Sequence, residues 1–322
     1  MTPGRIRALK ALGYGVVLLL LVAFVRQVPW RAVLLAARAA DPWLLFAAAA
    51  LNLVSLAAKG VRWWVFLRSV GVRSLPLVMR ATFAGASLNN LVVAQGGEGA
   101  RVLLVARGAG VSSARVLAAL AVERGFDALS YLVLVVGAAW LLPLPSVLLR
   151  WRDVAGVVLG VAVLAVAYML VRFRNAPHPV PDVNCAGGDT PSPLVRYTGH
   201  FRSAISSVTS AGSFAAGAAL SVVAWLLQVA TYHLVARATS SALPVAGSVA
   251  ALLAVGVSFL VRATPGNVGV FQMVYAFTVA SFGIARPDAV AIAILIQAVQ
   301  VLPTLVAGGI AHAMPVAVRE RQ

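Results

Sequence analysis

The chain has 322 residues, of which 61% are hydrophobic and only 11% are charged. In a soluble domain, about a quarter of the residues are charged. The low charged fraction of this chain, together with apolar runs of about 20 residues, indicates a polytopic membrane protein and excludes a soluble enzyme. The net charge of +17 does not indicate nucleic-acid binding, because the basic residues lie mainly at the edges of the apolar runs, as positive-inside topology requires. The single cysteine, Cys185, excludes an intrachain disulfide.

The first predicted helix is Ala11–Val25, which follows a short basic stretch. Signal peptides share this pattern, but a second apolar run follows closely and favours a retained helix. That second run, Trp43–Ala58, ends in a stretch that contains Lys59, Arg62 and two tryptophans. Paired tryptophans and basic residues are typical of a headgroup interface, so we expect the helix to end there.

A Gly-rich break follows. Leu77–Ala94 is apolar but marginal in length, and it leads into Gln95–Arg101, which a lipid-exposed helix would not tolerate. Further helices are predicted at Ala114–Leu142, Val154–Val171, Ser213–Ala236, Val245–Val261, Val268–Phe282 and Ala289–Ala313. The Pro-rich stretch 172–212 predicts a polar, flexible cytoplasmic loop. No soluble domain remains, so residues 1–322 form a single transmembrane domain.

Loop charge decides whether Leu77–Ala94 crosses the membrane, because cytoplasmic loops carry an excess of Lys and Arg. If the segment enters and returns on the cytoplasmic side, the inside holds more than twice as many basic residues as the outside, whereas a crossing makes the two sides nearly equal. We therefore expect a re-entrant segment, cytoplasmic N- and C-termini, and an all-α fold of seven or eight transmembrane helices. The count depends on Val268–Phe282, which is barely long enough to span.

Charged residues cluster around the first break. Glu98 and Arg101 share a helix face, and Glu123, Arg124 and Asp127 share another at the edge of an apolar segment. An isolated charge in hydrocarbon is costly, so these groups should face one another or a polar cavity. Two readings stay open and are compatible: a structural ion-pair network, and an anion site in which an arginine meets a phosphate.

A second break lies at Thr264-Pro265-Gly266, with Gly269 close behind. Pro265 cannot donate a backbone hydrogen bond, so a helix would restart after Gly266, with Thr264 as its cap and its positive dipole end facing the break. Gly-interrupted apolar segments in both halves of a membrane protein point to a transporter site. Buried glutamines such as Gln228, Gln297 and Gln300 are more typical of contacts between helices than of ligands.

These motifs, in this order, resemble the lysylphosphatidylglycerol synthase transmembrane region, a flippase-like family, over nearly the whole chain. They are Leu88-Asn89-Asn90, Gly97-Glu98, Arg101, Glu123-Arg124, Asp127, Thr264-Pro265-Gly266 and Gly269-Val270-Phe271. The resemblance implies an α-helical bacterial inner-membrane protein that moves or handles lipids. Gln272 stands where relatives commonly carry Glu, which puts in doubt any proton coupling there.

We therefore predict a lipid flippase that moves a phosphate-bearing phospholipid, hopanoid or polyprenyl-linked lipid, with no cofactor, metal or nucleic acid. Arg101 and Arg124 would bind the phosphate, while the carboxylates would position them. The full predicted substrate site is Arg101, Arg124, Glu98, Glu123, Asp127, Asn89, Asn90, Thr264, Pro265, Gly266, Gly269 and Gln272. A non-transporting scaffold of envelope lipid or glycan synthesis and a polyprenyl-phosphate-sugar enzyme are the alternatives; a separate lipid-modifying enzyme or glycosyltransferase is a candidate partner.

Overall fold

The computed structural model describes residues 26, 28–91, 96–146, 152–174, 211–259, 264 and 267–313. Within these ranges the chain consists of helices joined by short turns, with no strand, which confirms an all-α polytopic membrane protein. The expected first helix, Ala11–Val25, and most of the expected loop at 172–212 lie outside the described residues. Helix α8 ends at Arg174, before that gap, and helix α10 begins at Ala211, after it.

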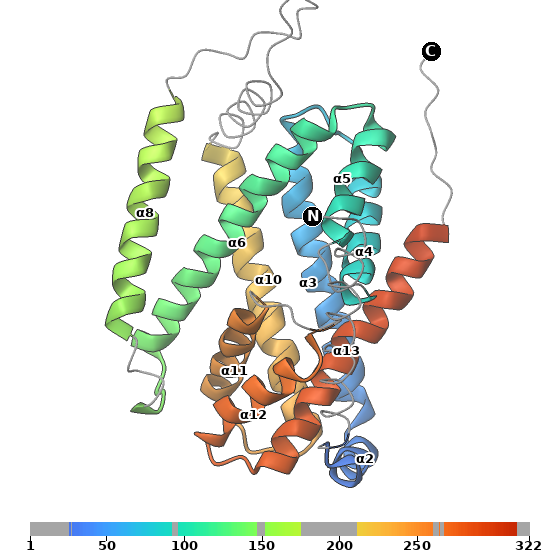
Figure 1. The fold of residues 1–322 in the computed structure, drawn as a ribbon, viewed down its shortest axis with the longest axis vertical. Coiled ribbons are helices and arrows are strands. Elements are labelled where there is room, and N and C mark those ends of the chain that lie inside the picture. The colour runs from blue at the N-terminus through green and yellow to red at the C-terminus, as the bar shows by residue number, and fades with distance from the viewer. Residues whose placement is uncertain are drawn as a thin grey trace, which may run out of the picture.

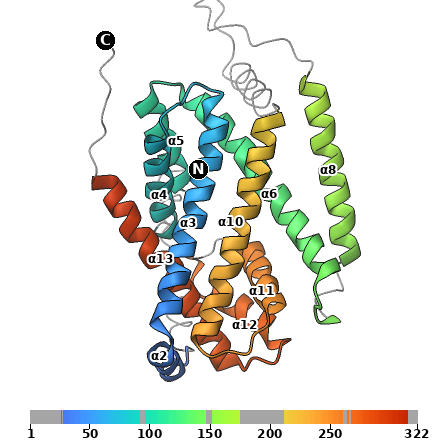
Figure 2. The same ribbon diagram turned by 180° about the vertical axis from the view of Figure 1, so that it is seen from behind.

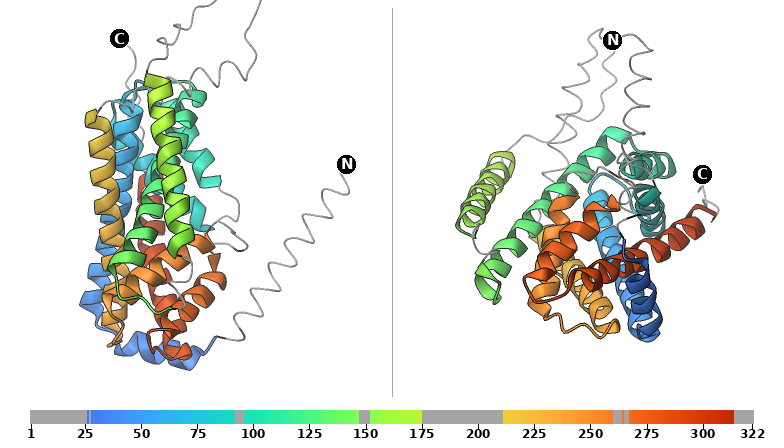
Figure 3. Two further views of the ribbon diagram at one scale, coloured as in Figure 1. Left: turned by 90° about the vertical axis from the view of Figure 1, so that its left-hand side faces the viewer. Right: turned by 60° about the horizontal axis from the view of Figure 1, so that its bottom comes forward.

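The described fold begins with α2 (Trp30–Ala39), a short helix that the sequence analysis missed. It lies across one end of the bundle (Figure 3). Next comes α3 (Pro42–Arg68), capped by the Asp41 carboxylate, which accepts hydrogen bonds from the backbone N–H groups of Trp43 and Leu44. The two ends of α3 define the Pro42 end and the Arg68 end of the bundle.

Helix α3 continues ten residues beyond the expected end at Ala58. No proline interrupts the helix after its first turn, so nothing stops it at the tryptophans. Lys59 and Arg62 therefore lie within a helix, and Arg62 is buried. The predicted end of the helix at Ala58 is therefore wrong.

The first break forms a hairpin of α4 (Leu75–Leu91) and α5 (Gly96–Ala109). The two helices are antiparallel, since Leu77 approaches Gly108 and Gly85 approaches Gly97. Both outer ends of this first hairpin lie at the Arg68 end, where the Trp64 indole donates a hydrogen bond to the carbonyl of Arg73. This arrangement matches the expected re-entrant segment (Figure 1).

Helix α6 (Ser113–Leu141) follows, with Ser112 as its N-cap, and it runs obliquely back toward the Pro42 end. Helix α8 (Arg152–Arg174) returns beside it at the periphery. Helix α10 (Ala211–Ala238) then pairs antiparallel with α3: Ala48 contacts Thr231, Asn52 contacts Gln228 and Ser55 contacts Ala224. The long helices thus alternate in direction through the bundle.

A second hairpin follows α10 and differs from expectation. Helices α11 (Val245–Ser258) and α12 (Val270–Ala280) have 14 and 11 residues, whereas the sequence analysis counted both segments as crossings. At 1.5 Å per residue they reach about 21 and 17 Å, short of a hydrocarbon core of about 30 Å. Both outer ends lie at the Pro42 end, opposite to the first hairpin (Figure 2).

The last helix, α13 (Arg286–Ala313), runs from the Pro42 end to the first hairpin, where Ser87 of α4 donates a hydrogen bond to the carbonyl of Thr304. The fold thus repeats one unit twice in opposite directions: a long helix, a short hairpin and a long helix. The first unit is α3, α4–α5 and α6, and the second is α10, α11–α12 and α13.

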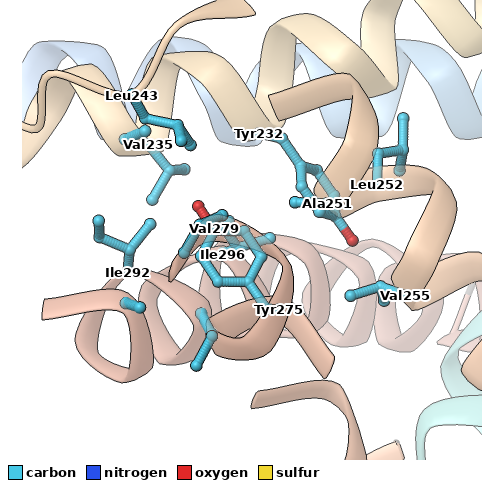
Figure 4. Packing of buried hydrophobic residues seen from close by; sticks show 14 of the residues in the cluster. Tyr232, Val235, Leu243, Ala251, Leu252, Val255, Tyr275, Val279, Ile292 and Ile296 are labelled. Carbon is cyan, nitrogen blue, oxygen red and sulfur yellow. The ribbon is translucent and has the colours of Figure 1, made fainter. Parts of the chain in front are cut away.

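The main apolar core lies between α10 and the second hairpin (Figure 4). Tyr232, Tyr275, Val279 and Ile296 are among its buried members. Large apolar side chains also cover the outside, including Trp43, Phe277 and Leu164. Three of the described helices, α3, α10 and α13, are long and apolar enough to cross a membrane by themselves, so lipid is the natural neighbour of this outer surface.

Candidate functional site

Six charged side chains form a closed ring between α3, the first hairpin and α6. Three arginines alternate with three carboxylates, so that each arginine contacts two carboxylates and each carboxylate contacts two arginines. In order around the ring they are Arg62, Glu123, Arg101, Glu98, Arg124 and Asp127. We call this set the ion-pair ring; its charges sum to zero.

One half of the ion-pair ring is buried. The Glu123 carboxylate lies 3.5 Å from Arg62 Nη2 and 3.3 Å from Arg101 Nη2, and its side chain is 2% exposed. The guanidinium of Arg101 also stacks over the ring of buried Trp63, at 4.1 Å from the centroid. Arg62 Nη1 donates to the Ser221 hydroxyl of α10 at 2.8 Å. These contacts hold the terminal guanidinium nitrogens of Arg62 and Arg101, whereas the buried Nε atom of each arginine has no hydrogen-bond partner among the described residues.

The other half reaches the surface. Arg124 is 49% exposed, and its Nη2 lies 2.6 Å from Glu98 Oε1 while its Nη1 lies 3.4 Å from Asp127 Oδ2. Asp127 in turn receives a 2.5 Å hydrogen bond from Arg62. An arginine with this exposure can exchange one carboxylate partner for an incoming anion without breaking the buried half.

The tip of the first hairpin positions Glu98. The Asn89 side chain donates to Glu98 Oε1 at 3.3 Å and accepts a hydrogen bond from the backbone N–H of Gly97 at 3.0 Å. The close approach of α4 and α5 requires glycine: a Cβ on Gly97 would lie 2.0 Å from the carbonyl oxygen of Gly85. The predicted pair Glu98 and Arg101 is therefore held by helix packing as well as by charge.

The exposed half of the ring faces a cavity of about 350 Å³. Seven predicted site residues line it: Asn89, Asn90, Glu98, Arg101, Glu123, Arg124 and Asp127. Lys59 of α3 lines it as well, with its ammonium 5.8 Å from the centroid of the Trp225 ring. Arg62 lies outside this lining, so the five ring residues that line the cavity sum to −1 and Lys59 brings the charge of the lining to zero.

Lys59, which lines the cavity, and Arg62, which closes the ion-pair ring, were not among the predicted site residues. A signal was present, since the helical pattern from Pro42 continues without a breaker and buries position 62 six residues inside the end of α3. The neighbouring tryptophans led to the prediction of a headgroup interface, but Trp63 is buried and stacks against the guanidinium of Arg101.

The far end of the cavity is polar but uncharged. Gln300 of α13 donates to Gln228 Oε1 of α10 at 3.0 Å, and Gln228 donates to Asn52 Oδ1 of α3 at 3.1 Å. The Asn52 side-chain amide donates to the backbone carbonyl of Gln300 at 3.2 Å, and its nitrogen lies 3.5 Å from the Thr304 hydroxyl. We call Asn52, Gln228, Gln300 and Thr304 the amide cluster; all four line the cavity.

The second break is packed differently from expectation. Helix α12 begins at Val270, where Gln272 Oε1 accepts a hydrogen bond from the backbone N–H of Gly269 at 2.7 Å. Thr264 does not cap this helix: its hydroxyl donates to the carbonyl of Val268. The positive φ of 91° at Gly269 makes the tight turn that replaces the expected restart after Gly266.

Thr264, Gly269 and Gln272 therefore lie outside the cavity lining. Gln272 is 2% exposed, and its Nε2 donates to Gln297 Oε1 at 2.5 Å. Pro265 and Gly266 lie outside the described residues. From the second hairpin, the cavity instead receives Gly256 of α11 and Phe259, the residue that follows this helix.

Comparison with known families adds to this geometry. The model of the family described as "Lysylphosphatidylglycerol synthase TM region" matches residues 10–308, which confirms the resemblance found in the sequence. No curated protein matches the chain.

Proposed function

Because the chain belongs to the lysylphosphatidylglycerol synthase TM region family, a family of membrane proteins tied to lipid handling, we propose that it moves a phosphate-bearing lipid across the inner membrane of a bacterium. The headgroup enters the cavity while the acyl or prenyl chains stay in the bilayer. The N- and C-termini of the chain are cytoplasmic in this proposal. The observation that carries it is the ion-pair ring, whose exposed half faces the cavity beside Lys59.

The chemistry of the site favours an anion. The ion-pair ring and Lys59 together carry a net charge of +1 when buried Arg62 is counted, and Arg124 is the most exposed arginine of the ring. A phosphate accepts a bidentate pair of hydrogen bonds from a guanidinium, so it can displace Asp127 or Glu98 from Arg124. The displaced carboxylate keeps its second arginine, which limits the cost of opening the ring.

Arg101 acts differently in this proposal from its role in the sequence analysis. It is 6% exposed and engages two carboxylates and Trp63, so it holds the ring and does not meet the phosphate first. Lys59 takes its place beside Arg124. Glu98, Glu123 and Asp127 keep the positioning role that the spacing predicted.

The repeated architecture supports transport. Two short hairpins enter from opposite ends, and the cavity receives residues from both: Asn89 and Asn90 from the first, and Leu252, Val255 and Gly256 from the second. Inverted repeats with a binding site between interrupted helices are typical of secondary transporters, in which one unit rocks against the other.

The alternative enzyme reading needs a carboxylate free to act as a base. Glu123 and Asp127 each contact two arginines, which counts against it. A non-transporting scaffold would not move lipid, so a transport measurement is needed to distinguish this role from the proposed one.

The test is translocation in vesicles that contain the purified protein. Fluorescent phosphatidylglycerol and phosphatidylmethanol are placed in one leaflet and their appearance in the other is timed. Arg124→Gln should slow translocation at least about tenfold, because a charge-assisted bidentate pair is lost. Arg152→Gln is the matched control: this exposed arginine at the start of α8 pairs with exposed Asp153, away from the cavity. Wild-type rates equal to those of Arg124→Gln, or of protein-free vesicles, would overturn the proposal.

A further inference from the structure

The cavity has two chemically different ends, and the proposed function uses only one. The charged end holds Lys59, Arg124 and the exposed carboxylates, whereas the opposite end is the amide cluster. Every Asp and Glu that lines the cavity belongs to the ion-pair ring. A headgroup that fills the cavity therefore meets paired charged groups at one end, with Arg124 the most exposed arginine among them, and neutral donors and acceptors at the other.

From this we infer that the substrate is a lipid whose phosphate carries an uncharged, hydroxyl-bearing group, such as a polyol or a sugar, and that the amide cluster binds these hydroxyls. The inference rests on the proposed function and adds the class of headgroup. Primary amides offer donors and acceptors on one group, which suits a hydroxyl that is itself both donor and acceptor.

Contacts between helices alone do not explain the amide cluster. A pair of side chains is enough to join two transmembrane helices, but here four side chains from α3, α10 and α13 converge near the middle of their helices and beside a void. Polar side chains near the middle of transmembrane helices are costly to bury, and they commonly mark a functional site. Asn52, Gln228 and Thr304 are each less than 10% exposed, so the low dielectric of their buried surroundings would strengthen a hydrogen bond to a ligand.

The cluster keeps capacity for a ligand. The bonds described above use one of the two N–H groups of Gln228 and one lone pair of its carbonyl oxygen, as counted among the described residues. Beside it, Trp225 and Tyr232 supply aromatic surface to the same cavity.

An amine-bearing headgroup fits less well. Its ammonium would have to compete with arginines for Glu98 or Asp127, because each of these carboxylates already contacts two arginines. A bare phosphate would leave the remaining donor and acceptor of Gln228 unused. The hydroxyl-bearing phosphate satisfies both ends.

The test compares two short-chain lipids that carry the same single negative charge. Phosphatidylinositol bears a ring of hydroxyls, and phosphatidylmethanol bears none. Their dissociation constants are measured by calorimetry on the whole protein in detergent. We expect phosphatidylinositol to bind about tenfold tighter, equivalent to one or two added hydrogen bonds.

Gln228→Met and Gln300→Met should bring the two constants together while leaving phosphatidylmethanol binding unchanged, which also shows that the variants fold. Gln297→Met is the matched control: it lies one turn from Gln300 on α13 and pairs with Gln272 outside the cavity. It should keep the tenfold preference.

Equal binding of the two lipids by the wild type, or a preference that survives both Gln228→Met and Gln300→Met, would overturn the inference. The phosphate site fails separately: if neither lipid binds, or if Arg124→Gln weakens neither, the proposed function falls and the inference with it. Equal binding that depends on Arg124 would leave the proposed function standing.

Discussion

At the scale of single residues, the ion-pair ring divides into a structural half and a half that ligands can reach. Glu123 joins two buried arginines and is itself 2% exposed, whereas Arg124 is 49% exposed. Removing one partner of a buried ion pair leaves an uncompensated charge and is strongly destabilising. Removing an exposed partner changes stability little. Substitutions in the two halves should therefore affect different properties.

Glu123→Gln tests the structural half. It should lower the free energy of unfolding by about 3 kcal/mol or more, because Arg62 and Arg101 lose their common counter-ion. The measurement is thermal unfolding of the purified protein in detergent.

The control for Glu123→Gln is Asp153→Asn, which removes a carboxylate that is 84% exposed from a pair at the surface. It should change the free energy of unfolding by less than about 1 kcal/mol. If both variants unfold alike, the buried half does not stabilise the fold.

The sequence predicts only part of the site, because helical spacing relates charged residues within one segment and not between segments. Glu98 with Arg101, and Glu123 with Asp127, are visible as helical spacings. Arg62 and Lys59 come from a helix far away in the sequence, and no spacing links them to the others. Packing of α3 against α6 and the first hairpin brings them together.

At the scale of elements, the first hairpin depends on the contact between Gly85 and Gly97. Gly97→Ala would place a Cβ 2.0 Å from a backbone oxygen and 2.6 Å from the Asn89 side chain, so α4 and α5 must move apart. We expect a loss of about 1–3 kcal/mol in the free energy of unfolding, as in other overpacked sites. Translocation should also slow, because Glu98 and Arg101 move with α5.

Gly99→Ala is the control for the hairpin prediction. A Cβ at this position meets nothing within 4 Å, and alanine is the better helix former. Thermal unfolding should therefore show a neutral or slightly stabilising effect. If both variants lose the same free energy of unfolding, the close approach of α4 and α5 is not the reason that glycine is needed at position 97.

The second hairpin shows why helix length could not be taken from hydropathy alone. Val245–Val261 and Val268–Phe282 are as apolar as crossing helices, but α11 ends at Ser258, and the turn at Asn267–Gly269 with the cap from Gln272 sets the start of α12 at Val270. Gln272, which stands where relatives commonly carry Glu, thus caps the N-terminus of α12 and donates a hydrogen bond to Gln297.

At the scale of the whole molecule, the two hairpins enter from opposite ends. Cysteines introduced singly after Cys185→Ser should show this. A membrane-impermeant thiol reagent should label Ser74→Cys and Ser112→Cys, which flank the first hairpin, from one side only. Ala242→Cys and Ser281→Cys flank the second hairpin and should react from the other side only.

The topology prediction has a clear contrary outcome. If Ser74→Cys and Ser112→Cys react from opposite sides, the first hairpin crosses the membrane. If all four positions react from the same side, the inverted repeat is lost, and with it the support that the architecture gives to transport.

The sequence by itself determined that this chain is an all-α membrane protein with two interrupted segments, because hydropathy and glycine act locally and leave their pattern along the chain. It also determined the family and five of the six members of the ion-pair ring. Only the tertiary structure decided that the ring closes through Arg62, that Lys59 shares its cavity and that the amide cluster faces it. Those contacts join residues far apart in sequence, and their positions follow from how long helices pack, which no local spacing encodes.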